Sequence, residues 1–432
     1  MTDFPRYDSY KDSGVEWLGA VPKHWKILPF KALFQMSQEK NGKNVVGEML
    51  SVSGYRGIEI KPYEYEEQKR SDDDLVDYRV VRPGQLVVNT MWLNYAGLGV
   101  SELDGHVSPA YRAYWMSEEL HKRFAHYLLR SHVYVQGYTS QMQGIRPNSL
   151  QIKNVDFHRF PILIPEFKEQ ERIAQFLDCS TAEIDRAISQ KQRLIELLQE
   201  QKAILINQAV TKGLNPNVPM RDSAIEWIGE IPEHWKVFPL TKYVKSIVDY
   251  RGKTPTKVES GVFLVTAKNI KDGLIDYEIS KEYVAKKEYG QIMSRGFPAQ
   301  NDLLFTTEAP LGGVALIDRE DVALAQRIIK FRLKEECLDP EFTRYSMLSS
   351  HFQNYLLTEA TGSTAQGMKA SKLHKLRIAA PPIEEQLEIV NFISLHLAQS
   401  SEVIFQQQGI IENLTELRQV LIANAVTGKI KV

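Results

Sequence analysis

The chain of 432 residues contains only two cysteines, Cys179 and Cys337, which lie far apart and outside any Cys-x-x-Cys pair. This scarcity argues against a disulfide framework and against a structural zinc site. No apolar run approaches the ~20 residues that a membrane span requires. Residues 1–5 also lack the charged and apolar regions of a signal peptide, so we expect a cytoplasmic protein without a membrane partner.

The motifs of common enzyme and cofactor sites are missing as well. Gly97-Leu98-Gly99 lacks the third glycine of a dinucleotide or adenosylmethionine loop, and no G-x-x-x-x-G-K-[ST] phosphate loop occurs. The chain has neither a G-x-S-x-G nucleophile motif nor an Asn/Asp-Pro-Pro-Tyr/Phe methyltransferase tetrapeptide. His24 and His234 each stand beside a tryptophan, which favours packing over metal binding. We therefore predict no catalytic residue, no metal site and no cofactor bound by this chain itself.

An excess of charge of one sign is also absent, because 53 Lys and Arg oppose 54 Asp and Glu. Nucleic-acid-binding domains are often basic, so the total charge favours an ordinary mixed surface. Residues 78–165 and 237–380 nevertheless each carry a small excess of Lys and Arg over Asp and Glu. On charge alone, binding of nucleic acid and an ordinary surface are equally open.

What the chain does contain is a long internal repeat. EWLGAVPKHWK at residues 16–26 returns as EWIGEIPEHWK at residues 226–236. Glu-Gln at 169–170, before a helical run ending in Ala-Val-Thr, likewise returns at 385–386. Two large copies are unlike a solenoid of many short repeats. They predict two similar domains and internal pseudo-two-fold symmetry.

The rest of the pattern predicts an α+β fold. Short β-rich runs and turns mark the globular parts, and a helical run follows each of them. The first of these helical runs contains no internal Pro or Gly. We expect two similar mixed α/β domains separated by two long antiparallel coiled-coil helices. The predicted boundaries are 1–167 and 215–382 for the domains, and 168–214 and 383–432 for the helices.

Both helical runs show the heptad spacing of a coiled-coil seam at a and d positions. Polar residues interrupt the seam at matching places, Lys191 with Gln407 and Lys202 with Arg418. The apolar residues expected to pack in the seam are Leu177, Ile184, Ile188, Ile195, Leu198, Leu205, Ile393, Leu397, Ile404, Ile411, Leu414 and Leu421.

A second apolar stripe runs beside this seam. It comprises Leu194, Leu197, Ile204, Ile410, Leu417 and Val420. A two-stranded coil does not need such a stripe, so it either contacts the adjacent domains or docks helices of partner subunits. A helix of about 28–33 residues is about 42–50 Å long at ~1.5 Å per residue. Such helices would suit two DNA half-sites about one helical turn, ~34–36 Å, apart.

Polar and basic loop residues form the candidate nucleic-acid contacts. Lys and Arg position a protein on phosphates, and Gln, Asn and Arg make bidentate contacts with base edges. Matching Gln-Gly dipeptides at 143–144 and 366–367 favour DNA contact over plain linkers, although strand-end groups can equally be structural. The first copy contributes Tyr55, Arg56, Asn89, Thr90, Trp92, Tyr111, Arg112, Ser140, Gln141, Gln143 and Arg146. The second contributes Tyr250, Arg251, Lys253, Thr254, Lys257, Lys268, Asn269, Thr306, Thr307, Gln326, Arg327, Ser363, Gln366, Lys369 and Lys372.

The ordered set of motifs resembles the specificity (S) subunits of type I restriction–modification enzymes. The duplicated Glu-Trp-Leu/Ile-Gly segment looks like the start of each target-recognition domain in that family. The Arg-Gly-Lys-Thr-Pro turn at 251–255, the segment 268–273 and Glu-Gln at the head of each helix are also similar. The resemblance covers essentially the whole chain.

This resemblance implies two target-recognition domains that each read half of a split site in double-stranded DNA. It also implies that the chain is a non-catalytic scaffold for two methyltransferase (M) subunits, which bind S-adenosylmethionine, and for restriction (R) subunits, which use ATP and Mg. The partner must flip its target adenine, so the S chain is expected to help hold distorted DNA.

The copies also depart from the family pattern and from each other. The first lacks the Arg-Gly-Lys-Thr-Pro turn, with residues 54–57 roughly in its place, and it has no Pro-Pro before its Glu-Gln. These differences fit two domains that read different half-sites. Two alternatives stay open: a tandem protein-interaction scaffold without DNA, and a specificity subunit of a related methyltransferase without type I restriction.

Overall fold

A computed structural model shows two compact units. The first unit comprises Met1–Gln192 and Gln408–Val432, and the second comprises Arg193–Gln407. Each boundary therefore falls within a long helix, whereas the sequence-based division gave each helix a segment of its own. The structure describes residues 4–54, 56–63, 70–144, 151–250, 252, 254–360, 367–368 and 370–432.

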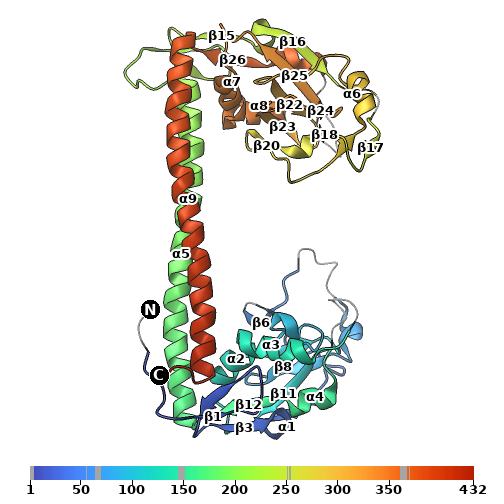
Figure 1. The fold of residues 1–432 in the computed structure, drawn as a ribbon, viewed down its shortest axis with the longest axis vertical. Helices are drawn as coiled ribbons and strands as arrows, with labels where there is room; N and C mark the ends of the chain where they lie inside the picture. The colour runs from blue at the N-terminus through green and yellow to red at the C-terminus, as the bar shows by residue number, and fades with distance from the viewer. Residues whose placement is uncertain are drawn as a thin grey trace. The chain divides into compact units, whose positions relative to one another are not determined.

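Two four-stranded sheets form the β part of the first unit (Figure 1). One sheet has the order β4-β11-β8-β9, with bounds Phe34–Met36, Arg112–Met116, Leu86–Val88 and Leu98–Val100. The other has the order β6-β5-β10-β7, with bounds Gly57–Ile60, Glu48–Ser53, Gly105–Val107 and Arg79–Val81. Short runs of Val and Leu suit strands that are buried on both faces, and all three residues of β8 are buried.

The second unit repeats the first sheet with longer strands. Its order is β16-β25-β22-β23, with bounds Val244–Asp249, Ile328–Leu333, Leu303–Thr307 and Leu311–Leu316. The other sheet has the order β17-β21-β18-β24, with bounds Lys257–Val258, Tyr283–Val284, Val262–Val265 and Val322–Leu324. In both units a parallel strand pair, β5 with β10 and β18 with β24, lies inside this sheet. These two sheets differ in one edge strand: β7 pairs with β10 in the first unit, whereas β17 pairs with β21 in the second.

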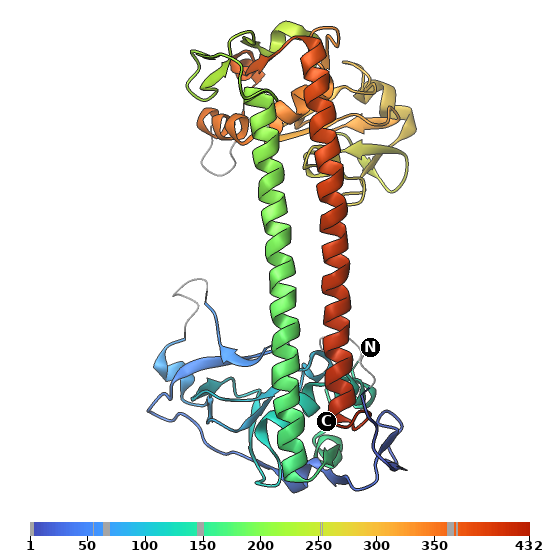
Figure 2. The ribbon, with the colours of Figure 1, turned by 90° about the vertical axis from the view of Figure 1, so that its left-hand side faces the viewer.

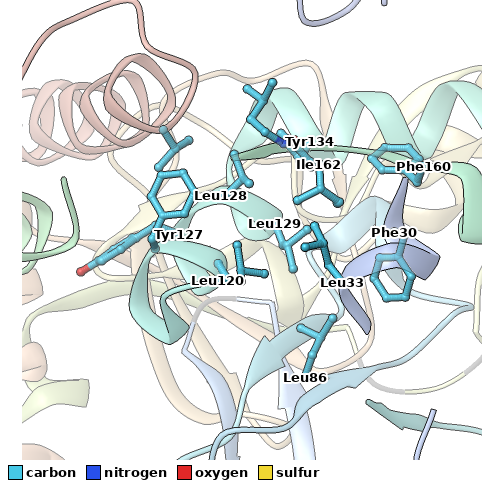
Figure 3. Close-up of a cluster of buried hydrophobic side chains, with 14 of the residues drawn as sticks. Phe30, Leu33, Leu86, Leu120, Tyr127, Leu128, Leu129, Tyr134, Phe160 and Ile162 are labelled. Carbon is cyan, nitrogen blue, oxygen red and sulfur yellow. Dashed lines mark hydrogen bonds between the residues drawn. The ribbon is translucent and has the colours of Figure 1, made fainter. Parts of the chain in front are cut away.

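Helices cover one side of the first sheet in each unit. In the first unit they are α1 (Phe30–Leu33), α2 (Lys122–Arg130), α3 (His132–Gln141) and α4 (Asn154–Arg159). Figure 3 shows how aromatic and leucine side chains from these helices meet the sheet in one core. In the second unit, α7 (Pro340–Leu348) and α8 (Ser350–Glu359) follow the sheet strands as α2 and α3 do in the first. The second unit also contains α6 (Lys286–Ile292).

Short strand pairs link each repeated segment to the long helices. β1 (Tyr10–Asp12) pairs with β2 (Ala20–Pro22), and β3 (Lys26–Pro29) pairs with β12 (Pro161–Ile164). The second unit repeats them as β13 (Met220–Asp222) with β14 (Glu230–Pro232), and β15 (Lys236–Pro239) with β26 (Arg377–Ala380). It also has the small hairpin of β19 (Ile270–Lys271) and β20 (Leu274–Ile275).

The duplicated Glu is the link between the repeated His-Trp and the long helix. Glu169 accepts a hydrogen bond from Trp25 Nε1 at 3.1 Å and lies 2.9 Å from His24 Nε2. Glu385 is bound by Trp235 Nε1 at 3.1 Å and lies 2.7 Å from the neighbouring histidine. Packing of the repeated histidines, the interpretation favoured above, is what the structure shows.

The duplicated Gln has an equally local role. Gln170 is fully buried, donates to Glu119 O and Pro165 O, and accepts from His121 N–H. Gln386 makes the matching bonds, accepting from Asp339 N–H and donating to Cys337 O in the loop before α7 and to Pro381 O before α9. Each Glu-Gln pair therefore ties a helix start to two other segments of its unit, which explains why the sequence repeats it.

The long helices α5 (Phe167–Lys212) and α9 (Ile383–Val426) lie side by side within each unit (Figures 1 and 2). In the first unit, Asp185 pairs with Arg418 at 3.0 Å, and the earlier Leu177 shares a core with the later Val426. In the second unit, Lys202 Nζ lies 3.2 Å from Ser401 Oγ. The order of these contacts makes the helices antiparallel, as predicted.

The predicted fold class, two mixed α/β domains with long antiparallel helices, is confirmed. The predicted seam residues are buried or half-buried along their whole length. Within the described ranges, no helix is long and apolar enough to cross a membrane.

Candidate nucleic-acid interface

The predicted strand-end residues come together at the same place in both units. In the first unit β11 pairs antiparallel with β8, and Arg112 lies opposite Val88. This register puts Tyr111 beside Asn89, and their side chains are hydrogen-bonded. In the second unit Thr307 N–H donates to Arg327 O at 3.0 Å. Equivalent sheets thus present different polar residues at equivalent ends.

Two adjoining pockets make the second unit the better-defined half of the candidate interface. Their volumes are about 220 and 240 Å³, and both are lined by Thr254 and Gln326. Gln326 Nε2 lies 3.4 Å from Thr254 Oγ1. The predicted residues that line one or both pockets are Tyr250, Thr254, Lys257, Lys268, Gln326 and Arg327. Segments distant in the sequence are therefore joined in one polar hollow.

Cations of this hollow are paired with acids of the same unit. Lys257 Nζ lies 2.7 Å from Glu282, and Arg327 Nε lies 3.0 Å from Glu308. Lys268 is exposed. Ion pairs between largely exposed groups contribute ~0–1 kcal/mol, so the exposed pair of Arg327 with Glu308 is weak.

α6 and the turn that follows it supply a further part of this hollow, which the sequence did not predict. Gln291, Ser294 and Arg295 line the pocket of about 220 Å³. Arg295 Nη1 donates to Asp249 O at 2.7 Å. Among the described residues between β6 and β7 of the first copy, no α-helix matches α6, so comparison of the copies gave no signal for it.

Tyr250 packs in the hydrophobic core of the second unit and is not a surface residue. Its side chain is only 7% exposed, and its hydroxyl donates to Gly296 O at 2.5 Å. Burial, followed by the nearby Asp302 carboxylate, raises the pKa of Tyr250 above its usual range. Asp302 also binds the buried Lys330 at 2.7 Å. Tyr250 therefore supports the wall of the pocket as a neutral hydroxyl.

Three predicted contacts need correction, because their side chains are buried and already bonded. Asn269 caps the turn that begins at Thr266 and donates to two carbonyl oxygens. Thr306 Oγ1 donates to Pro310 O at 2.6 Å and accepts from Gly313 N–H. Thr307 Oγ1 lies 3.3 Å from Arg327 O. These groups stabilise the strand end and present no exposed polar atom to DNA.

The first unit gathers another predicted group. Ser140, Gln141 and Gln143 line an open hollow of about 390 Å³ together with Asp156 and Arg159. Arg159 lies in the separate short helix α4, which only the fold brings close, so no sequence pattern linked it to this group.

The other predicted residues of the first unit surround the loop after β8. Asn89 is buried and its Oδ1 accepts from Met91 N–H, whereas Trp92 is 53% exposed. Thr90 is half-buried. Arg56 Nε pairs with Glu59 at 2.9 Å on the neighbouring turn.

The remaining candidates divide into bonded and undescribed residues. Lys372 Nζ donates to Glu359 O at 2.8 Å and pairs with the Glu359 carboxylate at 3.2 Å. The candidates that lie outside the described residues are Tyr55, Arg146, Arg251, Lys253, Ser363, Gln366 and Lys369.

The second apolar stripe of the helices is exposed in the structure. Leu197 and Ile204 are 45% and 56% exposed in the second unit, and Leu417 is 44% exposed in the first. Leu194, Ile410 and Val420 are also exposed. Burial against the adjacent α/β parts, one of the two interpretations above, is therefore contradicted for these residues.

The chain is similar in sequence and fold to known proteins. Residues 232–410 match the family described as the type I restriction modification DNA specificity domain. The MjaVIII type I restriction enzyme specificity subunit of Methanocaldococcus jannaschii is 26% identical over 291 residues, or 64% of this chain and 63% of that protein. The EcoBI specificity subunit of Escherichia coli is 21% identical over 322 residues, or 72% of this chain and 66% of that protein. The alignments thus span just under two thirds of these relatives.

A solved chain from a study of complex assembly and conformational transition of the type I R-M system shares the fold. Its TM-score is 0.69 at 15% identity, and the match covers 94% of this chain and 98% of that chain. Fold and site together define a duplicated protein whose two mixed α/β units carry different polar strand ends beside paired helices. Residues 232–410 thus match the type I restriction modification DNA specificity domain, and the resemblance of the chain to type I specificity subunits, noted from the sequence, is confirmed.

Proposed function

We propose that this chain is the DNA-reading subunit of a type I restriction–modification enzyme. Each unit reads one half of a bipartite, gapped site in double-stranded DNA. The paired helices set the spacing between the half-sites and dock two methyltransferase subunits. The chain itself carries out no catalytic step.

One observation supports this function above all: the two units repeat a scaffold and vary its strand ends. Tyr111 and Arg112 stand at the start of β11, whereas Gln326 and Arg327 stand at the start of the matching strand β25, and none of these four side chains is fully buried. A protein that reads two different sequences requires this combination, because the scaffold positions the domain while loop side chains read base edges.

The chemistry in this proposal belongs to partners. The methyltransferase subunits bind S-adenosylmethionine and modify adenine, and the restriction subunits use ATP and Mg. The exposed stripe through Leu197 and Leu417 is the docking face for helices of the methyltransferase subunits. The two alternatives, a scaffold without DNA and a methyltransferase subunit without restriction, are distinguished by the test below.

The test is a comparison of DNA methylation in host cells with and without this gene. Long-read sequencing should reveal one asymmetric, gapped adenine-methylation motif that is lost on deletion and restored by complementation. Complementation with Gln326→Ala should relax bases in one half of the motif only. Gln143→Ala should relax the other half. Gln201→Ala, at an exposed position of α5, is the control and should leave the motif unchanged.

Each alternative has its own result. An unchanged methylome after deletion contradicts the proposal and favours the protein scaffold. Loss of a motif together with an unchanged plating efficiency of unmodified phage indicates a methyltransferase that works without restriction.

A further inference from the structure

Two exposed aromatic rings dominate the loop between β8 and β9. Trp92 and Tyr95 are each 53% exposed and pack edge to face, with ring centroids 5.9 Å apart. Exposed apolar surface is unfavourable by ~25 cal/mol per Å² relative to burial. Large exposed apolar patches mark sites that a partner covers, so two adjacent exposed rings indicate an interaction surface.

The loop that carries these rings is held in one shape. Gly97 N–H donates to Trp92 O at 2.8 Å, and Asn89 N–H donates to Gly97 O at 2.7 Å. Gly97 has to be glycine, because a Cβ there would lie 2.5 Å from Trp92 O. Leu93, between the rings, is fully buried and anchors the loop to the core. The rings thus belong to an ordered loop.

Arg130, at the end of α2, joins this loop to the β5–β6 turn. Its guanidinium donates to Ser53 O at 3.2 Å and to Gly54 O at 2.8 Å. It also donates to Ala96 O at 3.1 Å and to Leu98 O. Burial, followed by the charge of a second arginine, lowers the pKa of Arg130 to about 10. Arg130 therefore stays charged at neutral pH, and its bonds to four carbonyls are charge-assisted.

The turn and the loop also touch directly. A Cβ at Gly54 would lie 2.4 Å from Tyr95 O, so only glycine allows this approach. The turn carries Arg56, whose side chain is 72% exposed. Arg130 thereby brings a cation and two aromatic rings into one surface beside the strand ends of the first unit.

Cations beside exposed rings match the chemistry of nucleic acid. Arginine contacts phosphate, while aromatic and apolar side chains pack against bases and sugars in a groove. The matching loop of the second unit, residues 308–310, has no aromatic residue. In that unit Arg344 of α7 donates instead to Gly273 O, at 3.0 Å, in the β19–β20 hairpin. An aromatic contact would thus belong to one half-site only.

We propose that Trp92 and Tyr95 pack against base and sugar groups of the first DNA half-site, and that Arg130 is the positioning residue that holds their loop against the β5–β6 turn. This inference rests on the proposed function and extends it. It assigns a contact of stated chemistry to one unit and a supporting role to a residue that the sequence motifs did not indicate.

The experiment uses the complex with its methyltransferase subunits and unmethylated duplex DNA that carries the motif found by methylation sequencing. Trp92→Ala should raise the KM for DNA methylation about tenfold, because the ring's contact with base and sugar groups in a groove is lost, while kcat changes little. Trp115→Ala is the matched control, because Trp115 is also exposed, at 46%, but lies within β11. It should leave KM unchanged.

Arg130→Met should raise KM and relax the first half of the motif, and Arg130→Lys should restore part of the loss, because lysine keeps the charge but not the planar fork. Equal KM values for Trp92→Ala and Trp115→Ala overturn the aromatic contact. Equal relaxation of both half-sites by Arg130→Met, with a lowered Tm, overturns the positioning role. A wild-type complex that methylates no bipartite motif refutes the proposed function itself, which separates that failure from failure of this inference.

Discussion

Glu169, near the start of α5, forms several hydrogen bonds with other segments of the first unit. The residue is 6% exposed and accepts hydrogen bonds from Trp25 Nε1 and from the hydroxyl of Tyr7, at 2.7 Å. Burial, followed by the bond to Glu169, raises the pKa of Tyr7 above its usual range, so the hydroxyl stays a donor. Its counterpart Glu385 has the same tryptophan bond, but its side chain is 29% exposed.

Glu169→Ala should therefore destabilise the first unit more than Glu385→Ala destabilises the second. Removal of Glu169 leaves buried donors without an acceptor, at a cost of about 1–3 kcal/mol for each such group. Water can replace part of the lost bond at Glu385, so a loss of about 1 kcal/mol is expected there. Urea unfolding followed by tryptophan fluorescence measures both. Equal losses would contradict the role of burial.

His126 makes the first unit sensitive to acid. Burial, followed by the charges of Arg130 and Arg123, lowers the pKa of His126 to about 3. The unfolded chain binds a proton near the ordinary histidine value of ~6.5. The stability that the neutral ring contributes is therefore present above that value and is lost progressively as pH falls from ~6.5 toward 3.

Between pH 7 and pH 5, this residue should lower the free energy of unfolding by up to about 2 kcal/mol. His126→Asn should remove most of that pH dependence, whatever its effect at neutral pH. His158→Gln, at an exposed position of α4 in the same unit, is the control and should keep it. Urea unfolding at both pH values measures the difference. A His126→Asn curve as steep as that of the wild type would refute the assignment.

At the scale of elements, the long helices combine a packed seam with polar layers at matching positions of the two copies. Asp185 with Arg418 in the first unit corresponds to Ser401 with Lys202 in the second. Polar groups at seam positions can select one register at a cost in stability. This arrangement accounts for the matching interruptions in both heptad patterns.

The exposed stripe beside the seam leads to a prediction about assembly. Leu197→Glu and Leu417→Glu should each leave the Tm within about 2 °C of the wild type, because exposed substitutions change stability by ~0.5 kcal/mol or less. Each should strongly reduce co-purification of the methyltransferase subunits, because a charge would enter an apolar interface. Gln201→Glu, also exposed on α5, is the matched control. Full co-purification of both leucine variants would exclude this stripe as the docking face.

For the whole molecule, charge predicts weak DNA binding by the isolated chain. The net charge is −1, and the cations of the second unit's hollow are paired with carboxylates. Since phosphate neutralisation supplies much of DNA affinity, the chain without methyltransferase subunits should bind its site at least tenfold more weakly than the complex does. Gel-shift titrations at two salt concentrations measure both affinities. Tight, specific binding by the isolated chain would refute the dependence on partners.

The sequence predicted the packing of the long helices better than it predicted the roles of loop residues. Heptad spacing identified the seam residues, because helical packing follows a local period that is written in the chain. The sequence placed Asn89 and Tyr111 at strand ends, but only strand pairing brought them side by side. Burial of Asn269 could not be anticipated, since an Asn in a polar turn has the same sequence appearance whether it faces water or caps the turn.

The sequence by itself determined the duplication, the fold class and the helical seam, because repeats and periodic apolar positions are properties of the chain alone. Only the tertiary structure decided which polar residues remain exposed and which segments share a surface. Arg130 shows the reason, because it donates hydrogen bonds to carbonyl oxygens of two different loops. The sequence does not indicate which backbone carbonyls a side chain will bind. Such contacts exist only after distant segments have packed together.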